Sequence, residues 1–223
     1  MASLKINIDG IKSFRDLKEY TSKEEIKLIL FAETHGLIDE LPIQEDLIRN
    51  LKPSYYAYEM LEDKKIITPN DFEEFLSKTD SEEFSIISTF GEIKPTIRLA
   101  NKYNVPVIGC DIKNMGRKNI EFRTKTNWTK EEKQEEEELH KKRELHQKEI
   151  IEKIMQKTNK LIFVSVGLYH LRQSSELIKH LKKYNFVIIY PTINGNKNFE
   201  NILDVNSDNI FHVVSSRDNY LSN

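Results

Sequence analysis

Short apolar runs, separated by amphipathic stretches, recur along the chain. The clearest run ends at Ala32 and is followed at once by the polar cluster Glu33-Thr34-His35-Gly36. Apolar runs of this length, rich in Ile, Leu, Val and Phe and bounded by polar sequence, are typical of buried strands. We therefore predict a strand over 26–32 and further strands over 55–60, 105–110, 161–166, 186–190 and 210–214, with Pro191 ending the fifth.

The stretches between these runs have helical spacing. Residues 39–51 place five apolar side chains on one face of a helix, and Pro53 ends it: Leu41, Ile43, Leu47, Ile48 and Leu51. Other helices are predicted over 11–20, within 69–103, and over 129–157 and 171–184. Alternating strands and helices predict an α/β fold, a three-layer sandwich with a mainly parallel central sheet flanked by helices. The length of 223 residues suits a single α/β domain over residues 1–223.

Composition narrows the possible partners. The formal net charge is −2, so no overall field favours nucleic acid or an anionic membrane. The single cysteine, Cys110, excludes an internal disulfide and a cysteine-based zinc site. No apolar stretch approaches the ~20 residues of a membrane span, and the first residues lack the apolar core of a secretory signal. We expect a cytoplasmic protein that acts on a small molecule or a peptide, without nucleic acid or membrane partners.

Four of the predicted strands end in groups that can do chemistry. Glu33 and His35 follow the first strand, Glu59 ends the second, Asp111 follows the third and His170 follows the fourth. Taken singly, each of these residues could be a polar residue that follows a strand simply because the strand ends there, without any functional role. In a parallel sheet, however, all carboxyl ends lie at one edge, where ligands bind. The set consists only of carboxylates and imidazoles, which indicates a shared site.

The long helix over 129–157 contributes a second group of candidates. Its acidic first half, 131–138, is typical of a solvated face. In the second half, one stripe at about 100° per residue contains Leu139, Arg143, His146, Ile150 and Ile154. An arginine on a core-facing stripe is costly unless it meets an acid or a bound anion. We therefore expect Arg143 and His146 to face the strand ends. We also expect residues 112–138 to form a lid or partner surface.

Two chemistries fit these residue types. His35, His170 and Glu59, with Asp111 and His146, could hold Zn²⁺, Mn²⁺ or Fe²⁺ and leave a position open for water. Without a metal, a histidine oriented by a glutamate can activate water directly. Arg143 would then hold an anionic group of the substrate or the developing oxyanion. The sequence has neither a glycine-rich phosphate loop nor a Gly-x-Ser-x-Gly elbow, which argues against nucleotide binding and serine hydrolysis.

The order of these motifs resembles a known superfamily over about residues 26–190. Ala32-Glu33-Thr34-His35 resembles its opening Gly-Glu-x-His motif, with alanine in place of the glycine. The later motifs are matched by Tyr58-Glu59-Met60, Gly109-Cys110-Asp111, Arg143-Glu144-Leu145-His146 and Gly167-Leu168-Tyr169-His170. The superfamily groups erythromycin-esterase-like and ChaN-like proteins and, more remotely, TraB/TIKI proteins.

The resemblance implies that Glu33, His35, Glu59, Arg143 and His170 line a site, with Asp111 and His146 as weaker transfers. Erythromycin-esterase-like members are implied to hydrolyse esters with histidine-activated water, and TIKI-like members to be metal-dependent proteases. ChaN-like members bind haem. We expect a hydrolase that cleaves an ester, a peptide or a related bond. The alternatives are a non-catalytic haem- or iron-binding protein, with His35, Tyr169 or His170 as ligand, and an interaction protein that has kept only the scaffold.

Overall fold

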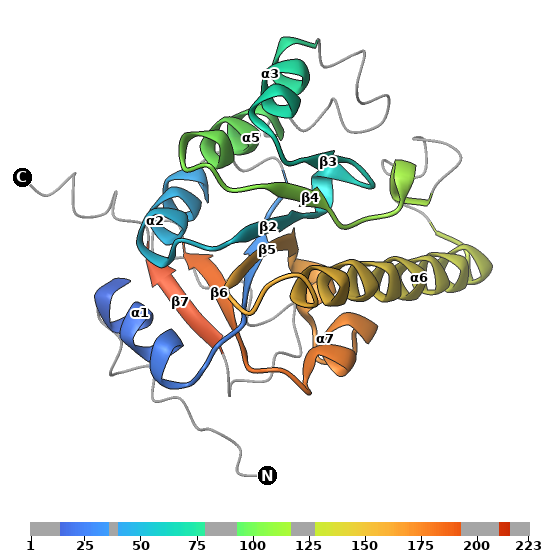
Figure 1. The fold of residues 1–223 in the computed structure, drawn as a ribbon. Coiled ribbons are helices and arrows are strands. Elements are labelled where there is room, and N and C mark those ends of the chain that lie inside the picture. The colour runs from blue at the N-terminus through green and yellow to red at the C-terminus, as the bar shows by residue number, and fades with distance from the viewer. Residues whose placement is uncertain (1–13, 36–39, 79–92, 117–127, 193–209, 215–223) are drawn as a thin grey trace, which may run out of the picture.

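A central sheet organises the molecule (Figure 1). The structure is a computed structural model and describes residues 14–35, 40–78, 93–116, 128–192 and 210–214. Seven strands in these ranges form one sheet in the order β3-β4-β2-β5-β1-β6-β7. All neighbouring pairs are parallel except β3 with β4. Across the sheet the strands are β3 (Lys65–Ile66), β4 (Val107–Gly109), β2 (Tyr55–Tyr58), β5 (Ile162–Gly167), β1 (Leu28–Glu33), β6 (Phe186–Thr192) and β7 (Ile210–Val214).

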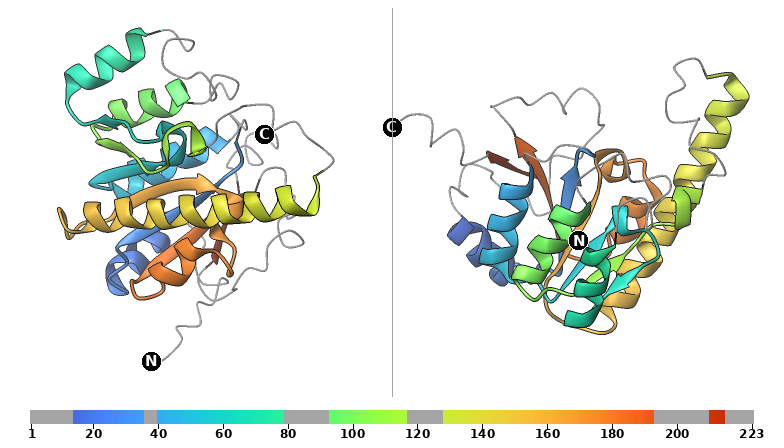
Figure 2. Two further views of the ribbon diagram at one scale, coloured as in Figure 1. Left: turned by 90° about the vertical axis from the view of Figure 1, so that its right-hand side faces the viewer. Right: turned by 90° about the horizontal axis from the view of Figure 1, so that it is seen from above.

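Helices cover both faces of the sheet, which confirms the predicted three-layer α/β sandwich (Figures 1 and 2). One apolar cluster joins alternate strand residues such as Phe31 and Phe163 to α1 (Phe14–Lys23), α2 (Leu41–Leu51), α3 (Pro69–Ser77) and α5 (Ile93–Lys102). A second cluster joins the opposite strand residues, such as Leu30 and Val164, to α6 (Lys130–Met155) and α7 (Glu176–Leu181). The fully buried strands β1 and β5 have side chains in both clusters, as expected for central parallel strands.

Helix α6 runs along one face of the sheet, and its N-terminal part extends beyond the sheet (Figure 2). Its first turn is closed by a capping box, in which the Thr129 hydroxyl accepts from the Glu132 N–H and Glu132 accepts from the Thr129 N–H. Most of residues 131–138 are exposed, as their acidic composition predicts. The expected lid over 112–138 includes 117–127, which lie outside the described residues, so that assignment stays a prediction.

Most predicted elements agree with the structure to within a few residues, and two differ for physical reasons. The helix expected over 171–184 is replaced by a 3-10 turn, η7 (Leu168–Leu171), and by α7, which begins only after Ser175 caps it. Pro191 does not end the fifth strand. At this position β6 is past its pairing with β1 and pairs only with β7, so that the missing N–H of proline is tolerated. Part of 69–103, where helices are predicted, lies outside the described residues.

The strand predicted over 210–214 is confirmed as β7, which is the last strand of the sheet within the described residues. Among the described helices, none has an apolar stretch long enough to cross a bilayer.

Gly109 at the end of β4 provides a test of how tightly the strand ends are packed. A Cβ atom at this position would lie 2.1 Å from the backbone oxygen of Glu62, which has no freedom to move away. Gly109→Ala should therefore lower the free energy of unfolding by at least about 3 kcal/mol, measured by urea denaturation. Gly167→Ala is the matched comparison, because its Cβ would meet a movable side-chain atom, His35 Nε2, at 2.7 Å. Equal losses in the two variants would contradict this account.

Candidate functional site

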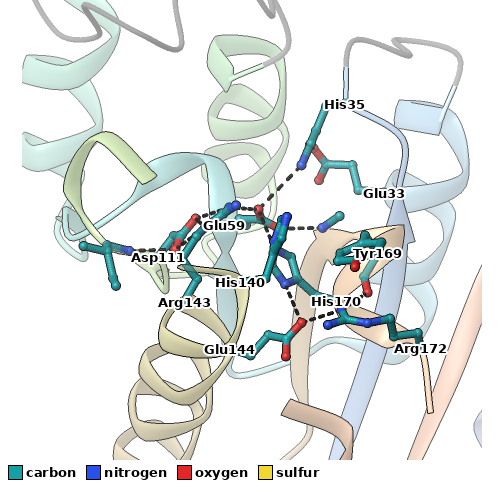
Figure 3. A network of polar contacts seen from close by, with 12 residues as sticks. Glu33, His35, Glu59, Asp111, His140, Arg143, Glu144, Tyr169, His170 and Arg172 are labelled. Atoms are coloured by element: carbon teal, nitrogen blue, oxygen red, sulfur yellow. Dashed lines mark hydrogen bonds and ion pairs between the residues drawn. The ribbon is translucent and has the colours of Figure 1, made fainter. Parts of the chain in front are cut away.

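The carboxyl ends of four neighbouring strands bring the predicted residues together (Figure 3). Across the sheet β4 leads to Asp111, β2 to Glu59, β5 to His170 and β1 to Glu33 and His35. Glu59 opens a 3-10 turn, η3 (Glu59–Leu61), and His170 lies in η7, so each chain turns sharply as it leaves its strand. The sheet order alone therefore places the acids and imidazoles side by side, as expected for the ligand-binding edge of a parallel sheet.

Arg143 of α6 connects two of these acids. Its Nε lies 3.0 Å from Asp111 Oδ2, and its Nη2 lies 2.6 Å from Glu59 Oε1 and 2.5 Å from Asp111 Oδ2. Asp111 and Glu59 are almost fully buried, with 0% and 1% of their side chains exposed. The arginine on the core-facing stripe thus meets acids, as the sequence requires. The carboxylates in turn depend on Arg143, since removing one partner of a buried ion pair leaves an uncompensated charge.

His35 is the site histidine with the greater access to solvent, because 23% of its side chain is exposed compared with 3% for His170. Its Nδ1 lies 3.2 Å from Glu33 Oε1, and the second oxygen of Glu33 accepts a hydrogen bond from the Ser165 hydroxyl. Its Nε2 lies 3.6 Å from Glu59 Oε1, which is beyond hydrogen-bond distance. The imidazole is thereby oriented through Nδ1 by Glu33, while Nε2 faces Glu59 as the partner of an ion pair.

His170 lies between two carboxylates. Its Nε2 is 3.3 Å from Glu59 Oε1, and its Nδ1 is 3.3 Å from Glu144 Oε1. The same Glu144 oxygen accepts from Arg172 Nη1 at 2.6 Å, while Glu144 Oε2 accepts from the backbone N–H of Glu176 at 2.8 Å. Glu144 therefore holds His170, Arg172 and the start of α7 together. It is one of the buried residues of α6.

The absence of a side chain at Gly167 leaves room for His35 beside Glu59. Gly167 pairs with Glu33 across β5 and β1, and its N–H donates to Glu59 Oε2. A Cβ atom here would lie 2.7 Å from His35 Nε2 and 3.4 Å from Glu59 Oε2. The glycine of the Gly-x-x-His motif thus makes space for the neighbouring strand's histidine. Ala32, by contrast, has its methyl in an apolar cluster of the core, where an extra carbon is accommodated.

Neighbouring carboxylates set the protonation of His35 and His170. Burial alone would lower the pKa of His35, but the negative charges of Glu59 and Glu33 outweigh it and raise the pKa well above its ordinary value. For His170, Glu59 and Glu144 outweigh burial in the same way and raise the pKa. Burial would raise the pKa of Glu59, but the two histidines hold it well below its usual range. Both histidines therefore favour the imidazolium form, and they face an ionised Glu59.

A third histidine, His140, lies beside the cluster in the opposite state. Its ring is 4.7 Å from that of Tyr169 and 5.6 Å from that of His170 (centroid distances). Burial, followed by the positive charges of His170, Arg143 and Arg172, lowers the pKa of His140 to about 3. His140 is therefore neutral at pH 7. Its Nε2 lies 3.1 Å from Glu136 Oε1, and its buried Nδ1 has no hydrogen-bond partner among the described residues.

His146 does not join the other predicted site residues, and the predicted metal ligands do not form a metal site. The buried residues of α6 are Arg143, Glu144, Gln147, Ile151 and Ile154, so that His146 is only half-buried, beside that face. Within the described ranges, no group of three or more His, Cys, Asp or Glu side chains has the arrangement of a metal site. Two predicted ligands, Glu59 and Asp111, are already bound by the guanidinium of Arg143, whose positive charge opposes a second cation. This donor set does not fit a metal ion.

Glu144, His140 and Arg172 were not found from the sequence. The stripe chosen on the long helix was rotated by about one residue from the true buried face. Anchoring the helical phase on Ile151 and Ile154 would have placed Gln147, Glu144 and His140 on that face, at spacings of three and four residues. Arg172 has no periodic signal, because it follows a short 3-10 turn.

Comparisons with known proteins support the fold. No family model matches the chain, and no curated protein matches it. The type III effector HopBA1 has a similar structure, with a TM-score of 0.52 and 15% identity over 91% of this chain and 93% of that one. ChaN of Campylobacter jejuni, described with cofacially bound haem, gives a TM-score of 0.52 and 14% identity over 89% of this chain and 91% of that one.

RRSP, a MARTX toxin effector domain from Vibrio vulnificus, gives a TM-score of 0.50 and 15% identity over 76% of this chain and 33% of that one. The predicted ChaN-like fold is therefore confirmed. Identities this low establish the fold and leave the chemistry to the site itself.

The protonation states can be tested by following the imidazole signals of labelled protein in an NMR pH titration. His35 and His170 should titrate above the ordinary value of about 6.5, and His140 near pH 3. Glu33→Gln should lower the pKa of His35, because it removes a charge that favours the imidazolium. The stability that His35 gains from its raised pKa is present below about pH 6.5 and is lost as the pH rises through the raised value.

Glu19→Gln, on the exposed face of α1, should leave all three titrations unchanged. A common pKa for the three histidines would contradict the assigned environments.

Proposed function

We propose that this protein is a hydrolase in which His35 activates water without a metal ion. The observation that supports this is the arrangement around Glu59 Oε1, where Nε2 of His35 and Nε2 of His170 meet a single buried oxygen. Each histidine is oriented by a second carboxylate through Nδ1, Glu33 for His35 and Glu144 for His170. A carboxylate that fixes the tautomer and orientation of an imidazole is a recurring feature of general acid–base catalysis.

In the proposed reaction, His35 transfers one proton. Nδ1–H stays directed at Glu33, and Nε2 in its unprotonated form takes a proton from a water molecule that attacks the acyl carbon of an ester or amide. The same proton then passes from Nε2 to the leaving oxygen or nitrogen, so that the histidine ends the cycle as it began. His35 is suited to this role because it is partly exposed, whereas His170 is buried.

The other groups support His35 through Glu59. Arg143 lies too deep to contact a substrate readily, with 4% of its side chain exposed, and both carboxylates it binds are buried. We infer that Arg143 and His170 keep Glu59 ionised, and that Glu59 stabilises the imidazolium of His35 as the proton is taken up. This assigns Arg143 to positioning and charge balance, in place of the direct oxyanion contact expected from the sequence. It also leaves no step for a metal ion.

The hydrolase proposal is tested by screening the purified protein against ester and peptide substrates and measuring kcat/KM of any activity. His35→Ala should lower kcat/KM by at least about 100-fold, the typical contribution of a general base. Activity should rise with pH through the raised pKa of His35, and Glu33→Gln should move this rise to lower pH. Treatment with a chelator should leave the rate unchanged.

The matched control is His180→Ala, an exposed histidine of α7 that should not affect the rate. Activity that survives unchanged in both His35→Ala and His170→Ala would disprove the proposal, and so would complete loss of activity on chelation.

Haem binding is the second candidate, favoured by the fold shared with ChaN and by one observation at the site. Among the candidate haem ligands, Tyr169 is 45% exposed, whereas His170 is buried. If Tyr169 binds haem iron, adding haem should produce a shifted Soret band in the wild-type protein. Tyr169→Phe removes the phenol oxygen and should abolish the shift. Tyr55→Phe, a partly buried tyrosine of β2, should retain it. An unshifted Soret band in the wild-type protein would exclude this function.

A further inference from the structure

Tyr169 and Arg172 form an aromatic and cationic pair at the margin of the site, with Tyr169 45% exposed and 16% of the Arg172 side chain exposed. The guanidinium carbon of Arg172 lies 3.9 Å from the centre of the Tyr169 ring, and the ring of His140 lies 4.7 Å from it. Tyr169 is one of three large apolar side chains exposed within the described ranges, the others being Ile67 and Leu145. Tyr169 lies in the turn that contains His170 and Arg172 directly follows it, so the pair is adjacent to His170 (Figure 3).

Arg172 uses only part of its hydrogen-bonding capacity in this arrangement. Its Nη1 donates to Glu144 Oε1 and to the backbone oxygen of Tyr169, each at 2.6 Å. The remaining donors, Nε and Nη2, have no protein partner within the described residues. These two atoms form the same edge of the guanidinium with which Arg143 binds Asp111. An edge with two parallel N–H groups matches the two oxygens of a carboxylate or a phosphate.

We propose that the Nε–Nη2 edge of Arg172, beside the ring of Tyr169, binds an anionic group of the substrate. The anion is a carboxylate or a phosphate, and the neighbouring ring favours a substrate with a flat apolar group next to it. The positive charge of Arg172 is only partly balanced, because its acidic partner Glu144 is shared with His170. The Tyr169 stack and the Glu144 contact fix the guanidinium in advance, which reduces the entropy lost on binding. Because it names a substrate class, this inference depends on the proposed hydrolase.

The pair also provides a link between binding and the catalytic groups. Glu144 Oε1 receives both Arg172 and the Nδ1 of His170, and His170 in turn faces Glu59 Oε1. An anion bound at the Nε–Nη2 edge therefore shares the positive charge of Arg172 with Glu144, whose Oε1 also faces His170. The proposed substrate-binding residue, Arg172, is thus connected to Glu59 through Glu144 and His170.

Binding of three small probes tests the inference without requiring turnover: benzoate, phenylphosphonate and benzamide. They have the same ring and differ in charge. Dissociation constants are measured by NMR titration of labelled protein, with the amide signals of Tyr169 and Arg172 as the local readout. At least one of the two anions should bind about 10-fold more tightly than benzamide, equivalent to about 1.4 kcal/mol. The tighter anion identifies carboxylate or phosphate as the substrate group.

In Arg172→Gln, the ratio of the dissociation constants of benzamide and the anion should fall to about 1. Arg172→Lys, which keeps the charge and loses the two-donor edge, should retain only part of the preference for the anion and serves as the second variant if Arg172→Gln does not fold. The control Arg15→Gln, an exposed arginine on α1, should keep the full preference. Equal binding of the three probes, or a preference unchanged in the Arg172 variants, would overturn the inference. Since no hydrolysis is measured, anion binding that persists without any activity would count against the proposed reaction alone.

Discussion

The burial of Glu59 is the constraint on which the site depends. A carboxylate with 1% of its side chain exposed is unfavourable unless positive groups and N–H donors surround it. Here one oxygen meets Arg143, His170 and His35, and the other accepts the N–H of Gly167. These partners come from α6, η7, the end of β1 and the end of β5. Satisfying this single group therefore fixes how four elements approach one another at the edge of the sheet.

The burial of Glu59 also gives the three histidines different protonation preferences. His35 and His170 face Glu59 and favour the imidazolium form, whereas His140 is surrounded by the resulting positive charges and favours the neutral form. Environments that push the pKa values of neighbouring groups apart are typical of acid–base sites. Structural ion-pair networks also shift pKa values. The partial exposure of His35 distinguishes this cluster from a fully buried ion pair.

The sequence predicts the architecture better than it predicts the complete site. Apolar runs identify the parallel strands because both faces of the sheet are covered, and their ends identify Glu33, Glu59, Asp111 and His170. Arg143 is found from the cost of burying its charge. Glu144 and His140 are missed because charged residues surround them on α6, so the helical phase is hard to place to within one residue. Pro191 is misjudged because the pairing of β6 with a later strand is a long-range property that a local pattern does not contain.

The chemistry follows from how the charges are paired, since the fold is shared by proteins as different as a haem-binding protein and two effectors. A metal site would need Glu59 and Asp111 to be open to a cation, yet Arg143 binds both. Arg143 is itself buried and fixed by α6, so a metal could enter only if the helix moved. The positive charge that a metal would bring to the strand ends is already supplied by the protein. What Arg143 cannot supply is a group that takes up and releases a proton, and in the proposed reaction His35 supplies it at the solvent side of the same carboxylate.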